Sequence, residues 1–212
     1  MISATRAIVL GYLRYGDSSL IANLYTESMG RQSVFVKGAF NRKSATSVAF
    51  FQPLHLVETH LHHRVNRQMQ RISNIRIYSP FQSIPFDPVK SCIAMFIAEI
   101  LYKTLREEET NPELFNFLLH TIEALDLNDQ GTANFHMAFL VHYSRYLGFY
   151  LKYDHLMAPQ LFGMSFDNLN SLQIDHHQRN YLTEYLLGCY SVHVANFGKL
   201  KSFPVLRNIF QE

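Results

Sequence analysis

The sequence of 212 residues has little cysteine and few charged side chains. Two cysteines, Cys92 and Cys189, are too few for a disulfide framework or for a zinc site made of four thiolates. Charged residues make up 17% of the chain and apolar residues 48%, whereas soluble domains average about 25% charged residues. This balance excludes a mainly disordered chain, and the length predicts one large domain or two small ones.

The sequence also lacks a long apolar run and a secretion signal. The longest strongly apolar stretch, residues 93–100, is interrupted by Glu99 and is far shorter than the roughly 20 residues that span a membrane. Residues 1–6 show no charged start followed by an apolar block and a cleavage site. We therefore expect a cytoplasmic protein with no membrane partner.

The net charge of +2 hides two regions of opposite charge. Residues 1–80 contain 10 Lys and Arg against 3 Asp and Glu, a balance of +7. Residues 81–212 contain 9 against 14, a balance of −5. Because the chain is not basic elsewhere, the basic region indicates an acidic partner, nucleic acid above all.

Strand patterns occur in the same basic region. β-branched residues, period-two alternation and polar or glycine-containing turns predict five short strands, at residues 5–13, 20–26, 32–37, 54–61 and 69–77. In the third strand Phe35 and Lys37 share the face opposite Val34. In the fifth, alternation puts Arg71 on the face of Ile75. Five short strands in 80 residues predict a small antiparallel barrel.

Helical periodicity begins after two prolines, Pro80 and Pro85, which separate the two regions. Apolar spacings of three and four, with capping residues and prolines at the starts, predict further elements, namely helices at residues 87–108, 111–125, 132–146, 175–190 and 203–210 and an irregular stretch at 150–172. The expected fold class is α+β, with a strand domain over residues 1–80 and an all-helical domain over residues 81–212.

Common catalytic signatures are absent from the sequence. There is no H-E-x-x-H, G-x-S-x-G or G-x-G-x-x-G motif. Residues 38–44 resemble a phosphate-binding loop but lack its second glycine, are one residue short and precede no expected helix. We therefore expect no catalytic residues, no cofactor and no enzyme activity.

One group of histidines is a candidate metal site. On a strand, His60 and His62 share a face with Glu58, and two imidazoles with a carboxylate could hold zinc for a hydrolase. A polar sheet face is the simpler interpretation, because no further ligand is close in the sequence. We expect no metal and keep a metal-dependent hydrolase as an alternative.

The basic side chains form two runs with aromatic residues between them. Such clusters neutralise phosphates and release counterions, and exposed aromatic rings stack on bases for about 1–3 kcal/mol each. Phe35, together with one of Phe50 and Phe51, fits the barrel core as well as it fits a base-stacking surface. The residues expected to contact DNA are Lys37, Arg42, Lys43, Arg31, Arg64, Arg67 and Arg71.

The order of short motifs in the basic region is similar to that of the RecO family of bacterial recombination mediators. The matching stretches are residues 7–10 (AIVL), 15–19 (YGDSS), 24–30 (LYTESMG), 34–39 (VFVKGA), 43–44 (KS) and 52–54 (QPL). Weaker matches in the helical region are residues 98–101 (AEIL) and 147–149 (LGF). By position, Lys37 and Lys43 fall in the family's basic strand and loop.

The resemblance implies an OB-fold barrel followed by a helical domain. It implies binding of single- and double-stranded DNA, annealing of complementary strands, and help in loading RecA onto single strands coated by single-stranded DNA-binding protein, in the RecF pathway. Implied partners are RecR and the C-terminal tail of the coating protein, with RecA as an indirect partner. The implied place of action is the cytoplasm, at the nucleoid.

The sequence departs from the family pattern after residues 148–149. Many members carry a four-cysteine zinc module there, but residues 150–156 contain no cysteine, and Leu151 stands where proline is usual. The resemblance therefore implies a member with a reduced helical domain, without the zinc module and without bound zinc.

A protein-interaction adaptor that binds the tail of the coating protein, without annealing activity of its own, is the alternative function. The acidic, apolar helical region would offer a groove to that acidic, aromatic-ended peptide. Arg145, Lys152 or Arg179 would supply its basic rim.

Overall fold

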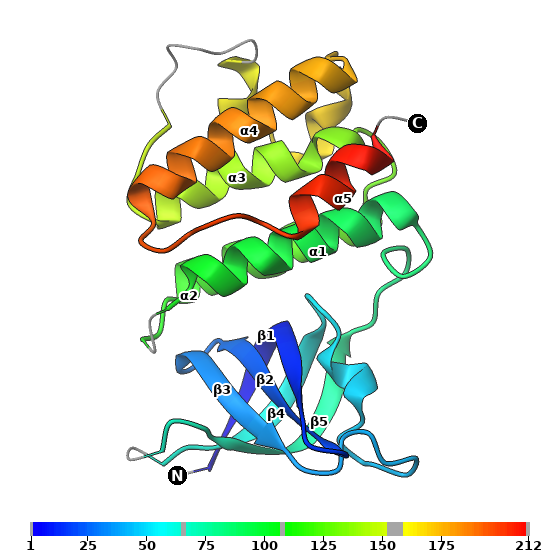
Figure 1. The fold of residues 1–212 in the computed structure, drawn as a ribbon, viewed down its shortest axis with the longest axis vertical. Helices are drawn as coiled ribbons and strands as arrows, with labels where there is room; N and C mark the ends of the chain where they lie inside the picture. Colours follow the sequence, from blue (N-terminus) through cyan, green and yellow to red (C-terminus); the bar gives the residue numbers. More distant parts are fainter. Residues whose placement is uncertain (1, 65–66, 107–108, 152–158, 211–212) are drawn as a thin grey trace. The chain divides into compact units, whose positions relative to one another are not determined.

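The structure is a computed structural model of the chain, and it describes residues 2–64, 67–106, 109–151 and 159–210. The chain divides into two compact units (Figure 1). The first unit contains residues 1–81 and 105–119, and the second contains residues 82–104 and 120–212. Residues 105–119 therefore group with the strands, and the expected division into consecutive domains at 1–80 and 81–212 stays a prediction.

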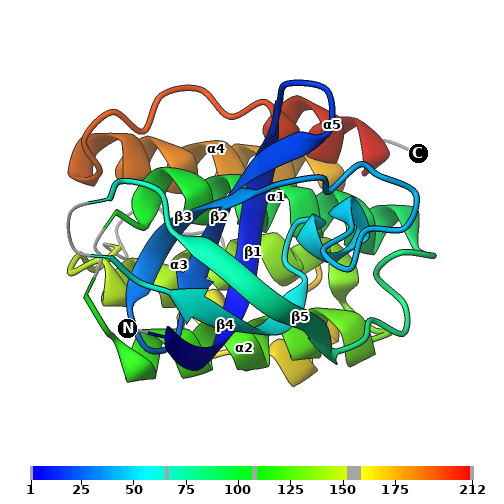
Figure 2. The same ribbon diagram turned by 90° about the horizontal axis from the view of Figure 1, so that it is seen from below.

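Five antiparallel strands build the first unit, in the spatial order β3-β2-β1-β4-β5. The strands are β1 (Ile2–Tyr15), β2 (Ser19–Thr26), β3 (Gly30–Val36), β4 (Leu56–His62) and β5 (Arg71–Ser79). The sheet closes into a barrel where Gln70, directly before β5, pairs with Val34 of β3 in parallel (Figure 2). This closed five-stranded order is that of an OB-fold and confirms the expected fold class.

The core of the barrel follows the alternation expected for β3. Val34 and Val36 are buried, Phe35 is half-buried on the outer face, and Lys37 is exposed just beyond the strand. Between Phe50 and Phe51, which belong to the short helix η1 (Val48–Phe51), Phe51 enters the core and is fully buried. The outer face of β3 is therefore half-buried, whereas its inner face is fully covered.

Two expectations for the later strands are wrong. Arg71 does not share a face with the isoleucines of β5, because Asn74 has a φ of +53° and the pairing with β4 shifts between Glu58 and His60. The local irregularity turns the isoleucines on both sides of Asn74 toward the core and leaves Arg71 exposed. β4 begins at Leu56 and not at residue 54, since Leu54 has a left-handed φ of +62°.

The described residues contain the five α-helices that periodicity predicts, with some ends shifted. They are α1 (Pro88–Thr104), α2 (Pro112–Leu127), α3 (Phe135–Tyr146), α4 (His176–His193) and α5 (Ser202–Ile209). The described part of the irregular stretch contains two short 3-10 helices, η4 (Pro159–Phe162) and η5 (Phe166–Ser171). Asp87 and Asp175 cap α1 and α4 through hydrogen bonds from backbone N–H groups. Among the helices of the described residues, none combines the length and apolar character needed to cross a membrane.

Glu99 of α1 has a structural role in the second unit. Its carboxylate accepts hydrogen bonds from the backbone N–H of Lys201 (3.0 Å) and Ser202 (2.8 Å) at the start of α5. Burial alone would raise the pKa of Glu99, but the hydrogen bonds from Ser202 and Lys201 outweigh it and lower the pKa. The one carboxylate inside the apolar run therefore caps another helix.

His136 of α3 lies in the core of the second unit. It is 1% exposed, stacks on Phe210 with ring centroids 5.6 Å apart, and places Nε2 2.9 Å from Thr183 Oγ1. Burial, followed by the charge of Arg179, lowers the pKa of His136 from 6.5 to about 3. The folded state therefore holds this imidazole neutral.

We predict that His136 makes the second unit less stable in mild acid. Because the unfolded chain binds the proton with a pKa of about 6.5, the stability contributed by the neutral ring is fully present above that pH. It is lost progressively as the pH falls toward about 3. The melting temperature should fall between about pH 7.5 and pH 5, and fall less in His136→Gln.

The exposed His120, also in the second unit, is the matched control. His120→Gln should keep the wild-type pH dependence. An unchanged slope in His136→Gln would contradict the prediction, and a smaller residual slope is expected because burial also lowers the pKa of His142.

Candidate nucleic-acid interface

The outer face of β2 and β3 presents an aromatic pair. The half-buried ring of Phe35 meets Tyr15, which is 58% exposed at the end of β1, edge to face with centroids 5.7 Å apart. Phe35 lies opposite Ile21 of β2 in the sheet. Oligonucleotides bind OB-folds at this face and at the adjoining loops, and an exposed aromatic ring offers a surface on which bases stack.

A first group of cations follows directly after β3. Lys37, Arg42 and Lys43 are exposed, and their side chains make no ion pair or hydrogen bond within the described ranges. The backbone of this loop is attached to the barrel, since the Phe40 N–H donates to the Ser18 carbonyl at 3.1 Å. The three residues therefore form one solvent-facing basic segment, as the sequence predicts.

Arg14 lies beside the same loop and was missed by sequence reasoning. Its guanidinium is 4.9 Å from the centre of the Phe40 ring and donates to the Asp17 carbonyl at 2.9 Å. Stacking of Arg14 on Phe40 fixes that aromatic side chain against β1. The sequence carries no local signal for this pair, because the two residues are distant along the chain.

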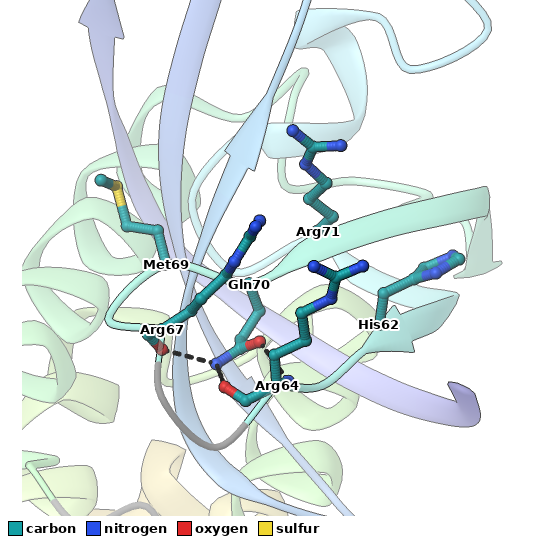
Figure 3. A pocket seen from close by; sticks show the side chains of 6 residues that line it. All are labelled: His62, Arg64, Arg67, Met69, Gln70 and Arg71. Carbon is teal, nitrogen blue, oxygen red and sulfur yellow. Dashed lines mark hydrogen bonds between the residues drawn. The ribbon is translucent and has the colours of Figure 1, made fainter. Parts of the chain in front are cut away.

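A second group of cations surrounds a small pocket in the loop between β4 and β5. We call it the arginine pocket; it has a volume of about 120 Å³ and is lined by His62, Arg64, Arg67, Met69, Gln70 and Arg71. Figure 3 shows the guanidinium groups of Arg64, Arg67 and Arg71 pointing to the same side. All three arginines are exposed, and they are three of the residues expected to contact DNA.

Arg31 differs from the other expected DNA contacts. Its side chain is half-buried and donates to the Leu105 carbonyl and, at 3.4 Å, to Asn23 Oδ1. Leu105 belongs to the first unit together with the strands. The structure therefore gives Arg31 partners inside the fold and does not bring it into either group of exposed cations.

The histidines of β4 are not assembled as a metal site. Glu58 pairs with Arg76, His60 Nδ1 lies 3.2 Å from Asn74 Nδ2, and His62 Nε2 lies 2.8 Å from Ser73 Oγ. Within the residues that the structure describes, no three potential metal ligands come together. These side chains instead link β4 to β5.

Of the three basic residues expected to form the rim for the adaptor function, the structure describes two. Arg179 donates to Asn134 Oδ1 at 3.1 Å and lies over Phe210, and burial lowers its pKa. Arg145 is exposed at the end of α3. Lys152 lies outside the described residues, as does most of the segment in which the zinc module is missing. Arg179 is therefore half-buried and bound to partners within the second unit.

Comparison with known proteins finds two family models that match successive parts of the chain. Residues 1–81 match the family model described as Recombination protein O N terminal, and residues 85–158 match that described as Recombination protein O C terminal. The DNA repair protein RecO of Bacteroides fragilis is 36% identical over 241 residues, covering 99% of this chain and 100% of that protein. The RecO proteins of Phocaeicola vulgatus and Flavobacterium psychrophilum are 35% and 34% identical, covering 99% and 97% of this chain and 100% and 98% of their own.

Arg31 should be more important for stability than for DNA affinity. We predict that Arg31→Ala lowers the free energy of unfolding by about 1–3 kcal/mol, because it removes hydrogen bonds made by a charged group. Lys37→Ala, at an exposed position nearby, should leave it unchanged. Urea unfolding measures both variants; unchanged stability together with a large loss of DNA affinity in Arg31→Ala would show the opposite role.

Proposed function

Because the chain belongs to the RecO family of DNA repair proteins, we propose that it acts as a recombination mediator without catalytic activity. It binds single- and double-stranded DNA, anneals complementary strands, and helps to load RecA onto coated single strands in the RecF pathway. RecR and the C-terminal tail of single-stranded DNA-binding protein are its direct protein partners, and RecA is an indirect one.

One observation carries this proposal. Residues 1–80 bear six exposed cationic side chains that make no ion pair or hydrogen bond among the described residues. They lie in the segments that follow β3 and precede β5 and at the first residue of β5, and Phe35 of the aromatic pair lies in β3. They are Lys37, Arg42, Lys43, Arg64, Arg67 and Arg71. Together they supply positive charge for the DNA backbone and an aromatic surface for bases.

The mechanism that fits this arrangement is electrostatic. Phosphate contacts neutralise the backbones of two strands and lower their mutual repulsion, while the base edges stay free to pair. Such contacts carry no base information, so binding and annealing should not depend on sequence. The protein then acts by bringing strands together, and no covalent bond is made or broken.

Charge reversal in the group of cations after β3 tests this mechanism. We predict that Lys37→Glu, Arg42→Glu and Lys43→Glu together weaken binding to single strands of every sequence. The slope of log affinity against log salt should become shallower by about 0.7 for each lost phosphate contact. Fluorescence anisotropy at several salt concentrations measures both quantities.

The matched control for that variant makes the same charge change in the second unit, at Lys199, Lys201 and Arg207. Its affinity for DNA should stay close to that of the wild type. An equal loss in the control, or wild-type affinity that does not change with salt, would contradict the electrostatic mechanism.

Annealing of coated strands separates the mediator from the adaptor. We predict that the wild-type chain anneals bare complementary strands and also strands coated by single-stranded DNA-binding protein. The reaction on coated strands should require the C-terminal tail of the coating protein, and the charge-reversed variant should lose both reactions. Fluorescence quenching between labelled strands follows the rate.

The control for this assay is a coating protein without its tail. Loss of annealing on strands coated with it, with bare strands unaffected, is the expected result. Binding to the tail without annealing of bare strands would instead show an adaptor.

A further inference from the structure

The backbone of Arg64 and Arg67, at the arginine pocket, is hydrogen-bonded to one side chain. Gln70 is 6% exposed, and its Oε1 accepts the Arg64 N–H at 2.8 Å. Its Nε2 donates to the carbonyl oxygens of Arg64 (3.2 Å) and Arg67 (2.8 Å) (Figure 3). A single amide thus fixes the backbone at both positions from which these two arginine side chains start.

The backbone of Gln70 is fixed as well. Its N–H donates to the Ser33 carbonyl at 2.8 Å, and its carbonyl accepts the Phe35 N–H at 2.9 Å. Gln70 therefore joins the arginine pocket to β3 next to Phe35, the aromatic residue on the outer face of that strand. Because the backbone of Arg64 and Arg67 is already fixed, binding through their side chains costs less conformational entropy.

The arginines of the pocket lack the partners that other arginines of the barrel have. Arg6 pairs with Glu27 and Arg76 pairs with Glu58. Across the described residues, the guanidinium groups of Arg64, Arg67 and Arg71 have no carboxylate partner. Three like charges around one hollow repel each other, so an anion in that hollow would be strongly favoured.

The size and chemistry of the hollow fit a phosphate group. Its volume of about 120 Å³ is several times the roughly 10–15 Å³ that one water needs. Guanidinium groups match phosphate oxygens with paired N–H donors. The wall on the side of His62 is fixed by its contact with Ser73.

We propose that the arginine pocket binds a single phosphate group of a DNA strand at a fixed position, and that Gln70 is the residue that positions its arginines. This rests on the proposed function and adds a discrete phosphate site to the general basic charge of the first unit. The phosphate is either an internal diester or the monoester at a strand end.

The test compares phosphate with chloride at equal ionic strength. Affinity of the full chain for a fluorescent single strand is measured in both salts, with inorganic phosphate as the competitor. We expect affinity to be roughly tenfold lower in phosphate, because phosphate occupies the pocket while general screening is the same. Equal affinity in the two salts would overturn the proposal.

Two triple variants assign the effect to the pocket. Arg64→Ala, Arg67→Ala and Arg71→Ala together should abolish the difference between the two salts. The matched triple Lys37→Ala, Arg42→Ala and Lys43→Ala should weaken binding in both salts and keep the difference. If the wild type binds DNA well without a difference, the phosphate site fails and the proposed function stands; if it does not bind DNA, the proposed function fails.

Gln70→Met tests the positioning role. Methionine fills a similar volume but cannot make the three hydrogen bonds to the loop, so the barrel is retained while the arginines lose their fixed starting points. The difference between phosphate and chloride should fall toward that of the triple arginine variant, although every arginine is still present. A full wild-type difference in a folded Gln70→Met would refute the role of Gln70.

A pair of oligonucleotides identifies the source of the phosphate. Strands of identical sequence with a 5′-phosphate or a 5′-hydroxyl are compared in chloride. Tighter binding of the phosphorylated strand, lost in the triple arginine variant, identifies the terminal monoester. Equal binding, together with the salt difference above, identifies an internal diester.

Discussion

Closure of the barrel at Gln70 is the constraint on which the first unit depends. Without it, β3 and β5 would be the two open edges of a five-stranded sheet, each with unpaired backbone groups. The backbone hydrogen bonds of Gln70 to Ser33 and Phe35 join those edges, and its side chain fixes the loop that precedes β5. Barrel closure and the candidate binding surface therefore share one residue, Gln70.

The second unit is stabilised in a different way, by buried polar groups that bind the ends of helices. Lys90 is 2% exposed and donates to Ser83 Oγ (2.7 Å) and the Asp126 carbonyl (3.0 Å). The Asp126 carboxylate accepts backbone N–H groups from residues 82–84. Burial alone would raise its pKa, but these backbone hydrogen bonds lower it. Such groups are strongly directional, so they specify one arrangement of the start of α1 and the last turns of α2, which both belong to this unit.

Local pattern was enough to predict the strands, the helices and the barrel, because each depends on periodicity and on turn residues close in sequence. It failed where a single residue breaks the period, as at Asn74 and Leu54, whose left-handed backbone has no signal in alternation. It selected Arg64, Arg67 and Arg71 as expected DNA contacts, which stays a prediction, but could not show that they line one pocket. Nor could it separate Arg31, whose partner Leu105 is distant in sequence, from the exposed cations. Such cases depend on tertiary contacts, which give no signal in the local sequence.

The structure divides the 10 basic residues of residues 1–80, the source of the +7 balance, into two groups. Four of its 10 basic residues, Arg6, Arg14, Arg31 and Arg76, bond to other groups of the first unit. The remaining six point to solvent, without a carboxylate partner in the part of the chain that is described.

Unpaired like charges repel and oppose the compact state, so folding alone gives no reason to gather three of these six at one pocket. Binding to DNA does give a reason, because phosphate relieves the same repulsion. The proposed DNA contacts of the basic region are therefore the cations that the fold leaves unpaired among the described residues.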